Sequence, residues 1–307
     1  IVMGISFTFV SIMCFVGPTY GYNAIVGAVL VGGLIEGVLG LLAKYWLKLI
    51  TPIVSASVVT AIGFSLLSVG AASFGGGSGS ENFGSITNWV LGSITLLCCI
   101  LFNIFAKSYW KQLSVLFGLI VGYIVAIFMG VVDFSALNST SIVTLPSIMP
   151  FKPEFNINAI ISVTLIFLVS ATETIGDTSA LAATGLNRNT TVKETSGSIA
   201  CDGFISALSS VFGCLPITSF SQNVGLVTMT KVVNRYAFTM GAIFLIIAGF
   251  CPKLAAIVNV MPQSVLGGAA VMMFSSIVVS GITLVNKAGI TTRTTTIFSL
   301  ALGLGYG

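Results

Sequence analysis

The chain has 307 residues, of which 56% are hydrophobic and 7% charged, and its formal net charge is +4. Soluble domains carry about 25% charged residues, so this composition excludes a soluble globular domain and a disordered chain and predicts a protein embedded in a lipid bilayer. The sequence has no histidine, which excludes Ser-His-Asp catalysis, histidine-ligated metals and histidine proton relays. Any proton chemistry must therefore use carboxyl groups, hydroxyls or lysine.

Apolar stretches of the kind that cross a bilayer follow one another along the chain. We expect spans at 8–17, 23–43, 53–72, 89–106, 113–132, 157–175, 196–213, 236–251, 263–285 and 294–307. Segment 214–231 is too polar for a plain span, and Pro216 blocks a continuous helix, so we expect a broken crossing with a short strand and a half-helix. Both ends of the sequence lie within apolar stretches, so we expect a piece of a longer chain.

Basic residues predict which side of the membrane each loop occupies. Five pairs of them follow alternate spans: Lys44 and Lys48, Lys107 and Lys111, Arg188 and Lys193, Lys231 and Arg235, Lys287 and Arg293. All five pairs fall on one side if 214–231 crosses the membrane, and the excess of Lys and Arg in cytoplasmic loops makes that side cytoplasmic. The net positive charge therefore indicates topology, and no basic run indicates nucleic-acid binding.

Four acidic residues lie at or near membrane depth, where a charge costs about 2.5–3.5 kcal/mol on insertion scales. Glu173 and Asp177 are four positions apart on one helix face, which suits a site that takes up a proton or hydrogen-bonds a neutral substrate. The alternative is a packing or topological role at a partly wet helix end. For Asp202 and for Glu36, which lies mid-span in a glycine-rich helix, functional and structural roles are both open.

The polar segment also carries groups that suit a planar ligand. Gln222 offers a donor and an acceptor to the edge of a heterocycle, and Phe220 and Phe7 could stack on its ring, although both rings could instead face lipid or core. Ser6-Phe7-Thr8-Phe9 is similar to Ser219-Phe220-Ser221-Gln222, which suggests two inverted halves of one fold. Inverted repeats with broken helices are typical of transporters that bind substrate near the midplane.

Three stretches resemble the nucleobase–ascorbate transporter family. The ten residues Gln222-Asn223-Val224-Gly225-Leu226-Val227-Thr228-Met229-Thr230-Lys231 match that family's signature along its full length. Ser6-Phe7-Thr8-Phe9 looks like the short strand of its third segment. Thr172-Glu173-Thr174-Ile175-Gly176-Asp177 looks like its eighth segment, with the substrate-binding carboxylate at Glu173.

The resemblance implies an all-α polytopic membrane protein. Its transmembrane segments would form an inverted repeat of seven plus seven with two short β-strands in broken helices, of which this chain would hold about segments three to thirteen. We expect a core domain at 1–50 and 157–252, an external loop at 136–156, and a gate domain at 51–135 and 253–307 that is truncated and forms a homodimer.

The resemblance also implies a function. The protein would be a secondary active transporter, not an enzyme, that imports a purine nucleobase, xanthine or uric acid, into a bacterium across the cytoplasmic (inner) membrane by alternating access. It would need no metal or other cofactor, and its coupling ion would be H⁺ rather than Na⁺. The alternatives are a permease for uracil or another nucleobase, an anion transporter of the same fold, or a passive facilitator.

Site roles follow from the same resemblance. Glu173 and Gln222 would hydrogen-bond the base, and Ser221 would contribute backbone groups. Phe7 and Phe220 would pack on the ring, and Asn223 would support the site. The residues expected to couple the proton or to organise the site are Asp177, Asp202 and Thr230.

Overall fold

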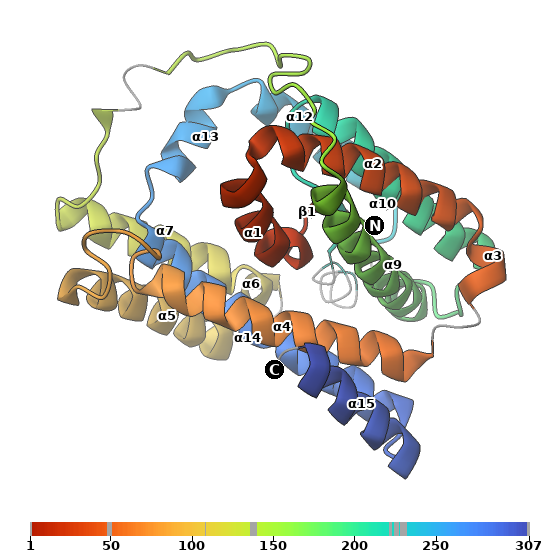
Figure 1. Ribbon diagram of the computed structural model, residues 1–307. Coiled ribbons are helices and arrows are strands. Elements are labelled where there is room, and N and C mark those ends of the chain that lie inside the picture. Colours follow the sequence, from red (N-terminus) through yellow and green to blue (C-terminus); the bar gives the residue numbers. More distant parts are fainter. Residues whose placement is uncertain are drawn as a thin grey trace. The chain divides into compact units, whose positions relative to one another are not determined.

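The computed structural model describes residues 2–47, 51–107, 109–135, 140–220, 223, 227 and 232–305. Within these ranges the chain is mostly helical and has two short strands (Figure 1). The elements are β1 (Met3–Ile5), the 3-10 turn η1 (Phe7–Phe9), α1 (Val10–Tyr20), α2 (Tyr22–Leu41), α3 (Ala43–Trp46), α4 (Pro52–Phe74), α5 (Ile86–Phe105), α6 (Tyr109–Gln112), α7 (Ser114–Phe128), α9 (Ile157–Gly185), α10 (Val192–Val211), β2 (Ile217–Ser219), α12 (Arg235–Gly249), α13 (Pro252–Asn259), α14 (Gln263–Ala288) and α15 (Thr292–Gly305).

Helices occupy the predicted spans. Among the described residues, five helices are long and apolar enough to cross a membrane, or up to six if α12 and α13, bent by 81°, form one broken span. The bend was not predicted, and it falls where Pro252 begins a new helix, a position that needs no backbone N–H. Whether 214–231 crosses the membrane stays a prediction.

Helix α9 is longer than its predicted span. It continues past residue 175 to Gly185, so Glu173 and Asp177 lie inside a continuous helix rather than at a wet helix end. The residues after Asp177 include Ala180 and Leu181, which are strong helix formers and carry the helix on. The two acids therefore do not lie at the end of the helix, and the alternative of a packing or topological role for them stays open.

The chain divides into two compact units. One consists of Ile1–Ile62, Ser147–Val233 and Val278–Gly307, and the other of Gly63–Pro146 and Asn234–Ile277. The first unit holds both strands and helices α1, α2, α9 and α10. The expected boundaries of core domain, loop and gate domain stay a prediction.

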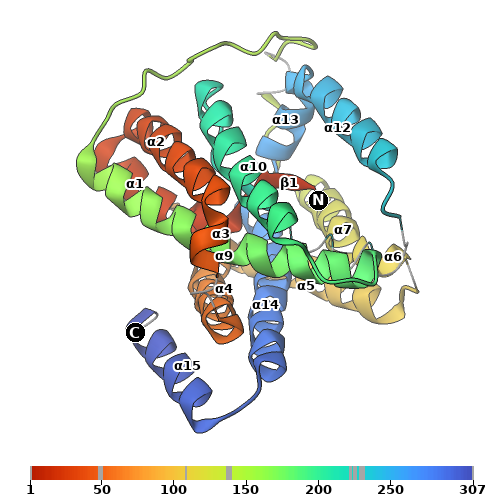
Figure 2. The ribbon, with the colours of Figure 1, turned by 90° about the vertical axis from the view of Figure 1, so that its right-hand side faces the viewer.

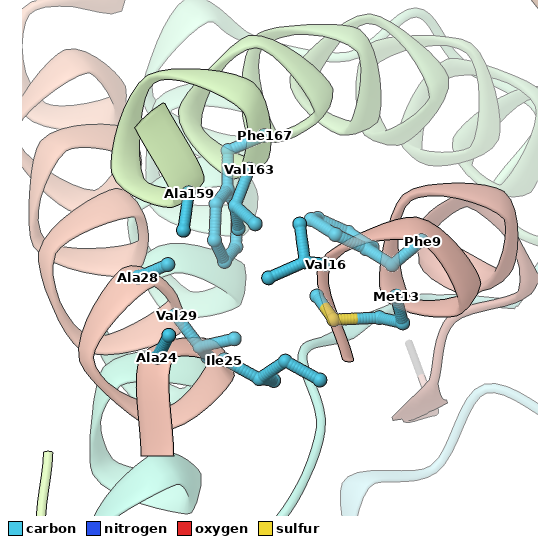
Figure 3. Close-up of a cluster of buried hydrophobic side chains, with 10 residues drawn as sticks. All are labelled: Phe9, Met13, Val16, Ala24, Ile25, Ala28, Val29, Ala159, Val163 and Phe167. Atoms are coloured by element: carbon cyan, nitrogen blue, oxygen red, sulfur yellow. The ribbon is translucent and has the colours of Figure 1, made fainter. Parts of the chain in front are cut away.

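The core of the first unit lies where α1, α2 and α9 meet (Figure 3). The rings of Phe9 and Phe167 pack edge to face with their centroids 4.6 Å apart, which fixes the end of η1 against α9. Small side chains on α2 and α9 let the helices approach closely, as in other membrane helix pairs. The buried members of this core are Phe9, Met13, Val16, Ala24, Ile25, Ala28, Val29, Ala159, Val163 and Phe167.

Helices α2 and α10 run side by side with their backbones in direct contact (Figure 2). A Cβ atom added to Gly203 on α10 would lie 2.2 Å from the backbone nitrogen of Gly37 on α2. A Cβ atom added to Gly40 would lie 2.3 Å from the backbone nitrogen of Ala200. These distances leave no room for a side chain, so glycine at these positions allows the two helices to pack.

The connection from α9 to α10 ends in a capping box. The Thr191 hydroxyl accepts from the N–H of Glu194, and the Glu194 carboxylate accepts from the N–H of Thr191. Arg188 forms an ion pair with the same carboxylate. The Arg188 guanidinium, followed by the Thr191 backbone, holds the pKa of Glu194 at about 2.

The second unit has its own core. Leu91 of α5, Ala126 of α7 and Val265 of α14 are fully buried against one another. A Cβ atom on Gly118 would lie 2.1 Å from the sulfur of Cys99, so α5 and α7 pack closely at this point. Glycine-mediated packing is thus common to both units.

Candidate functional site

Two short strands join parts of the first unit that are far apart in sequence. β1 and β2 pair in antiparallel register, with Met3 opposite Ser219. The Ser6 backbone N–H extends the pairing by donating to the carbonyl of Pro216 at 3.1 Å. Backbone groups that an interrupted helix leaves unpaired are satisfied here by the other strand, as irregular backbone at membrane depth requires.

The first strand lies earlier than predicted. The resemblance placed it at Ser6–Phe9, but it ends at Ile5, and Phe7–Phe9 form the turn η1. Ser6 explains the difference, because its hydroxyl accepts from the backbone N–H of Thr8 at 3.2 Å and caps the turn.

Phe220 and Asn223 hold the segment after β2 against the start of β1. Two ring atoms of Phe220 lie 2.6 Å from where a Cβ atom on Gly4 would be, so the ring packs directly on the glycine and would have to shift for any other residue. The Phe220 N–H donates to the carbonyl of Val2 at 3.2 Å, and the buried Asn223 side chain donates to the same carbonyl at 2.7 Å. Asn223 therefore organises the backbone at the strand pair.

Glu173 points its carboxylate at the turn that follows β1. The Thr8 hydroxyl donates to Oε2 of Glu173 at 2.7 Å. Thr8 is placed for this bond by the Ser6 cap, and Glu173 by the packing of Phe167, nearly two turns earlier on α9, against Phe9. A carboxyl group is thus held beside the strand pair.

Asp202 is fully buried on α10 and belongs to a hydroxyl network behind β2. The Thr174 hydroxyl donates to Oδ2 of Asp202, and the Ser219 hydroxyl donates to Thr174 at 3.3 Å. Thr218 joins the network by accepting from the Ser170 hydroxyl at 3.0 Å. Through these bonds a buried acid on one helix contacts both the α9 helix and strand β2.

The other predicted residues divide into two groups. Asp177 is buried, 8% exposed, one turn beyond Glu173 on α9, and Phe7 is partly buried in η1. The strands, η1, α9 and α10 thus gather Phe7, Phe220, Asn223, Glu173 and Asp202 in one region of the first unit. Ser221, Gln222 and Thr230 lie outside the described residues.

Hydroxyl side chains at this site were not singled out from the sequence. Thr8 and Thr174 each donate to a carboxyl group, and the hydroxyl of Thr218 on β2 lies 3.4 Å from that of Thr174. The signal was present, because Ser170 and Thr174 are four positions apart and share a face of an otherwise apolar helix. A search for hydroxyl side chains on the helices that carry the acidic residues would have found Ser170 and Thr174.

Comparison with known proteins identifies relatives over nearly the whole chain. A family model described as Permease family matches residues 1–307. The chain is 36% identical to the nucleobase transporter PlUacP of Paenibacillus larvae, over 99% of this chain and 71% of that protein. It is 35% identical to the uric acid permease PucK of Bacillus subtilis, over 99% and 72%. It is 32% identical to the xanthine permease XanQ of Escherichia coli, over 100% and 69%.

Among solved structures, the chain resembles the transmembrane domain of the bicarbonate transporter BicA of a cyanobacterium. The match has a TM-score of 0.66 and 16% identity, and it covers 98% of this chain and 79% of that one. At this identity the likeness concerns the fold alone. It confirms the predicted fold class, a polytopic helical membrane protein with two short strands in broken helices.

Proposed function

The chain belongs to the Permease family, and we propose that it imports a purine nucleobase, xanthine or uric acid, with proton symport by alternating access. The family consists of integral membrane proteins, and the xanthine and uric acid permeases among the relatives confirm the predicted resemblance. The relatives are named as permeases or as a transporter, and such proteins are not enzymes. They are bacterial proteins, in keeping with residence in the bacterial cytoplasmic membrane.

The observation that carries the proposal is the Glu173 carboxyl group beside the strand pair. A carboxylate has two oxygens with about four lone-pair sites, and the Thr8 hydroxyl uses one of them. The remaining sites can accept the ring N–H groups of a neutral purine. Phe220, packed over Gly4, and Phe7 supply aromatic faces to such a ring. In this proposal Gln222 and Ser221 contribute hydrogen bonds, and Thr230 helps to organise the site.

Proton coupling is supported by the chemistry available to the chain. Without histidine, carboxyl groups are the side chains suited to exchange a proton near neutral pH. Asp202 and Asp177 are buried on α10 and α9, and we propose that they carry or organise the coupled proton. We also propose a homodimer formed through the gate domain.

Uptake of labelled xanthine and uric acid by cells or proteoliposomes tests this proposal. We expect accumulation that a protonophore abolishes and that unlabelled purines inhibit more strongly than uracil. Glu173→Gln keeps the size of the side chain and removes its charge, and we expect it to reduce uptake by at least about tenfold, the loss of one charged hydrogen bond. Glu81→Gln, an exposed acid in the second unit, serves as the matched control and should transport normally.

Wild-type uptake in the Glu173→Gln protein would contradict the proposed site. Uptake that survives collapse of the proton gradient would favour a passive facilitator. Inhibition by uracil rather than by purines would favour a uracil permease.

An anion transporter is the second candidate, because the chain shares its fold with the transmembrane domain of a bicarbonate transporter. The position of Glu173 argues against it. An ionised carboxylate beside the strand pair would repel an anion, and this repulsion is strong where water is scarce. Labelled bicarbonate or sulfate uptake measured with the same preparations distinguishes the two.

A further inference from the structure

Glu36 is a buried acid that does not belong to the candidate site described above. It lies in the middle of α2 and is 1% exposed. Among the described residues, neither of its carboxyl oxygens has a hydrogen-bond partner. An ionised carboxylate in such a position costs several kcal/mol, so the group must carry a proton or share one with a neighbour.

The neighbour is Asp202. Glu36 interacts electrostatically with Asp202 across the α2–α10 contact. This contact is tight, because a Cβ atom on Gly203 would lie 2.8 Å from the backbone carbonyl carbon of Glu36. Asp202 is 0% exposed, and its Oδ1 atom also has no partner among the described residues. Two buried carboxyl groups with three unpaired oxygens among the described residues thus lie on the two helices that meet at this contact.

The other elements packed on α2 provide no counter-charge within this contact. On α9, Glu173 acts electrostatically on Asp202 and not on Glu36. The remaining titratable or charged groups of α1, α3, α9 and α10 are Cys14, Tyr20, Lys44, Tyr45, Asp177, Lys193, Glu194 and Cys201, and none of them forms a hydrogen bond or an ion pair with Glu36 among the described residues. The pair therefore has no basic side chain as a counter-charge among the described residues, and a bound proton would neutralise it.

We propose that Glu36 and Asp202 together bind the transported proton, and that Glu36 is the residue that makes substrate movement depend on it. This inference rests on the proposed transport function. The step is a plain proton transfer: on one side of the membrane an O–H bond of a hydronium ion breaks as an O–H bond to a carboxyl oxygen of the pair forms, and water is left. That bond breaks when water on the other side accepts the proton, and no electrons are transferred.

The hydroxyl network gives the pair a route to the substrate site. Asp202 accepts from Thr174, which in turn accepts from Ser219 on β2. A proton that moves onto Asp202 removes charge from the acceptor of this chain and weakens its hold on β2. A proton that moves to Glu36 leaves Asp202 ionised and the network strong. The pair can therefore report its proton occupancy to the strand pair without contacting substrate.

The test uses the whole protein reconstituted in vesicles, with labelled xanthine as the probe and two measurements. Exchange of internal for external xanthine needs no net proton movement, whereas accumulation driven by an inside-alkaline gradient does. Glu36→Gln imitates a permanently protonated acid. We expect it to retain exchange within about twofold of wild type and to lose at least nine-tenths of accumulation, a loss of about 1.4 kcal/mol or more of driving force. Glu81→Gln should behave as wild type in both measurements.

Wild-type accumulation by Glu36→Gln overturns the inference, and so does an equal loss of exchange and accumulation, which would indicate a structural role. Should the glutamine variant fail to fold, Glu36→Asp carries the test, because it keeps the carboxyl group. We expect it to accumulate xanthine with a shifted pH midpoint, and an unshifted midpoint overturns the inference. The proposed function fails differently: the wild type would then exchange no purine, or would accumulate it with a sodium gradient alone.

Discussion

Replacing Gly203 with alanine places a methyl group between two helix backbones. Its Cβ atom would lie 2.2 Å from the nitrogen of Gly37 and 2.6 Å from the carbonyl oxygen of Gly33. Ordinary van der Waals contacts are about 3.4–4 Å, so α2 and α10 would have to move apart by about 1 Å. Overpacking of a core costs about 1–3 kcal/mol, and backbone atoms cannot rotate away as side chains do. Alanine regains at most about 1 kcal/mol through its higher helix propensity.

Gly197→Ala on the same helix is the matched control, because nothing lies within 4 Å of its added Cβ atom. We expect this control to be as stable as wild type or slightly more stable, and Gly203→Ala to be less stable by about 1–2 kcal/mol. Thermal unfolding in detergent, followed by size-exclusion chromatography of heated samples, compares the two variants directly. Equal melting temperatures for both variants would refute the close approach of α2 and α10, and with it the enclosure of Glu36.

Two further predictions concern hydrogen bonds to carboxyl groups. Thr8→Val removes the donor to Glu173, and we expect the apparent affinity for xanthine in competition assays to fall about 10- to 150-fold, the equivalent of about 1.5–3 kcal/mol. Thr8→Ser keeps the hydroxyl and should stay within a few-fold of wild type in the same assays. An unchanged affinity in the valine variant would contradict the role of Thr8. The pKa of Glu194 falls from 4.5 to about 2 on folding, so its cap and ion pair with Arg188 stabilise the protein fully above about pH 4.5 and are lost as the pH falls towards 2. The protection of backbone N–H groups at the start of α10 against hydrogen exchange, taken relative to the rate of an unstructured peptide at each pH, should therefore fall over that range in wild type but not in Glu194→Gln. Parallel pH profiles of protection would be inconsistent with the cap.

The positions of the helices were largely predictable from sequence, because apolar length and basic flanks are local signals. Helix ends were less predictable. The predicted span that holds Glu173 ended at residue 175, ten residues before the end of the helix at Gly185. From the sequence alone, a run of polar residues resembles a helix terminus, because the elements that bury those residues are unknown. The predicted span at 236–251 ended close to the break before Pro252, but the helix α13 that follows was missed because its eight residues are too few for a span.

The candidate site was predicted in part. The acids were identifiable because burying a charge is expensive wherever it occurs. Their partners were not, because the contacts of Thr8 with Glu173 and of Thr174 with Asp202 join segments far apart in the chain. The first strand was predicted too late in the sequence, because a serine such as Ser6 is compatible both with a strand and with the cap of a turn. For Glu36 the sequence left packing and function open, and the lack of hydrogen-bond partners for its carboxyl group among the described residues is the observation on which the proposed function rests.

The strand pair also constrains the order in which the protein can assemble. Val2 accepts from Asn223, 221 positions later, so β1 waits for most of the chain to be synthesised before its partner exists. Unpaired backbone groups cannot remain in hydrocarbon, where each costs several kcal/mol. The segment around β1 must therefore stay hydrated, or be held by other proteins, until β2 arrives. Closure of this small sheet is a late step that joins the Ile1–Ile62 and Ser147–Val233 parts of the first unit, and a chain interrupted between α10 and β2 would leave it open.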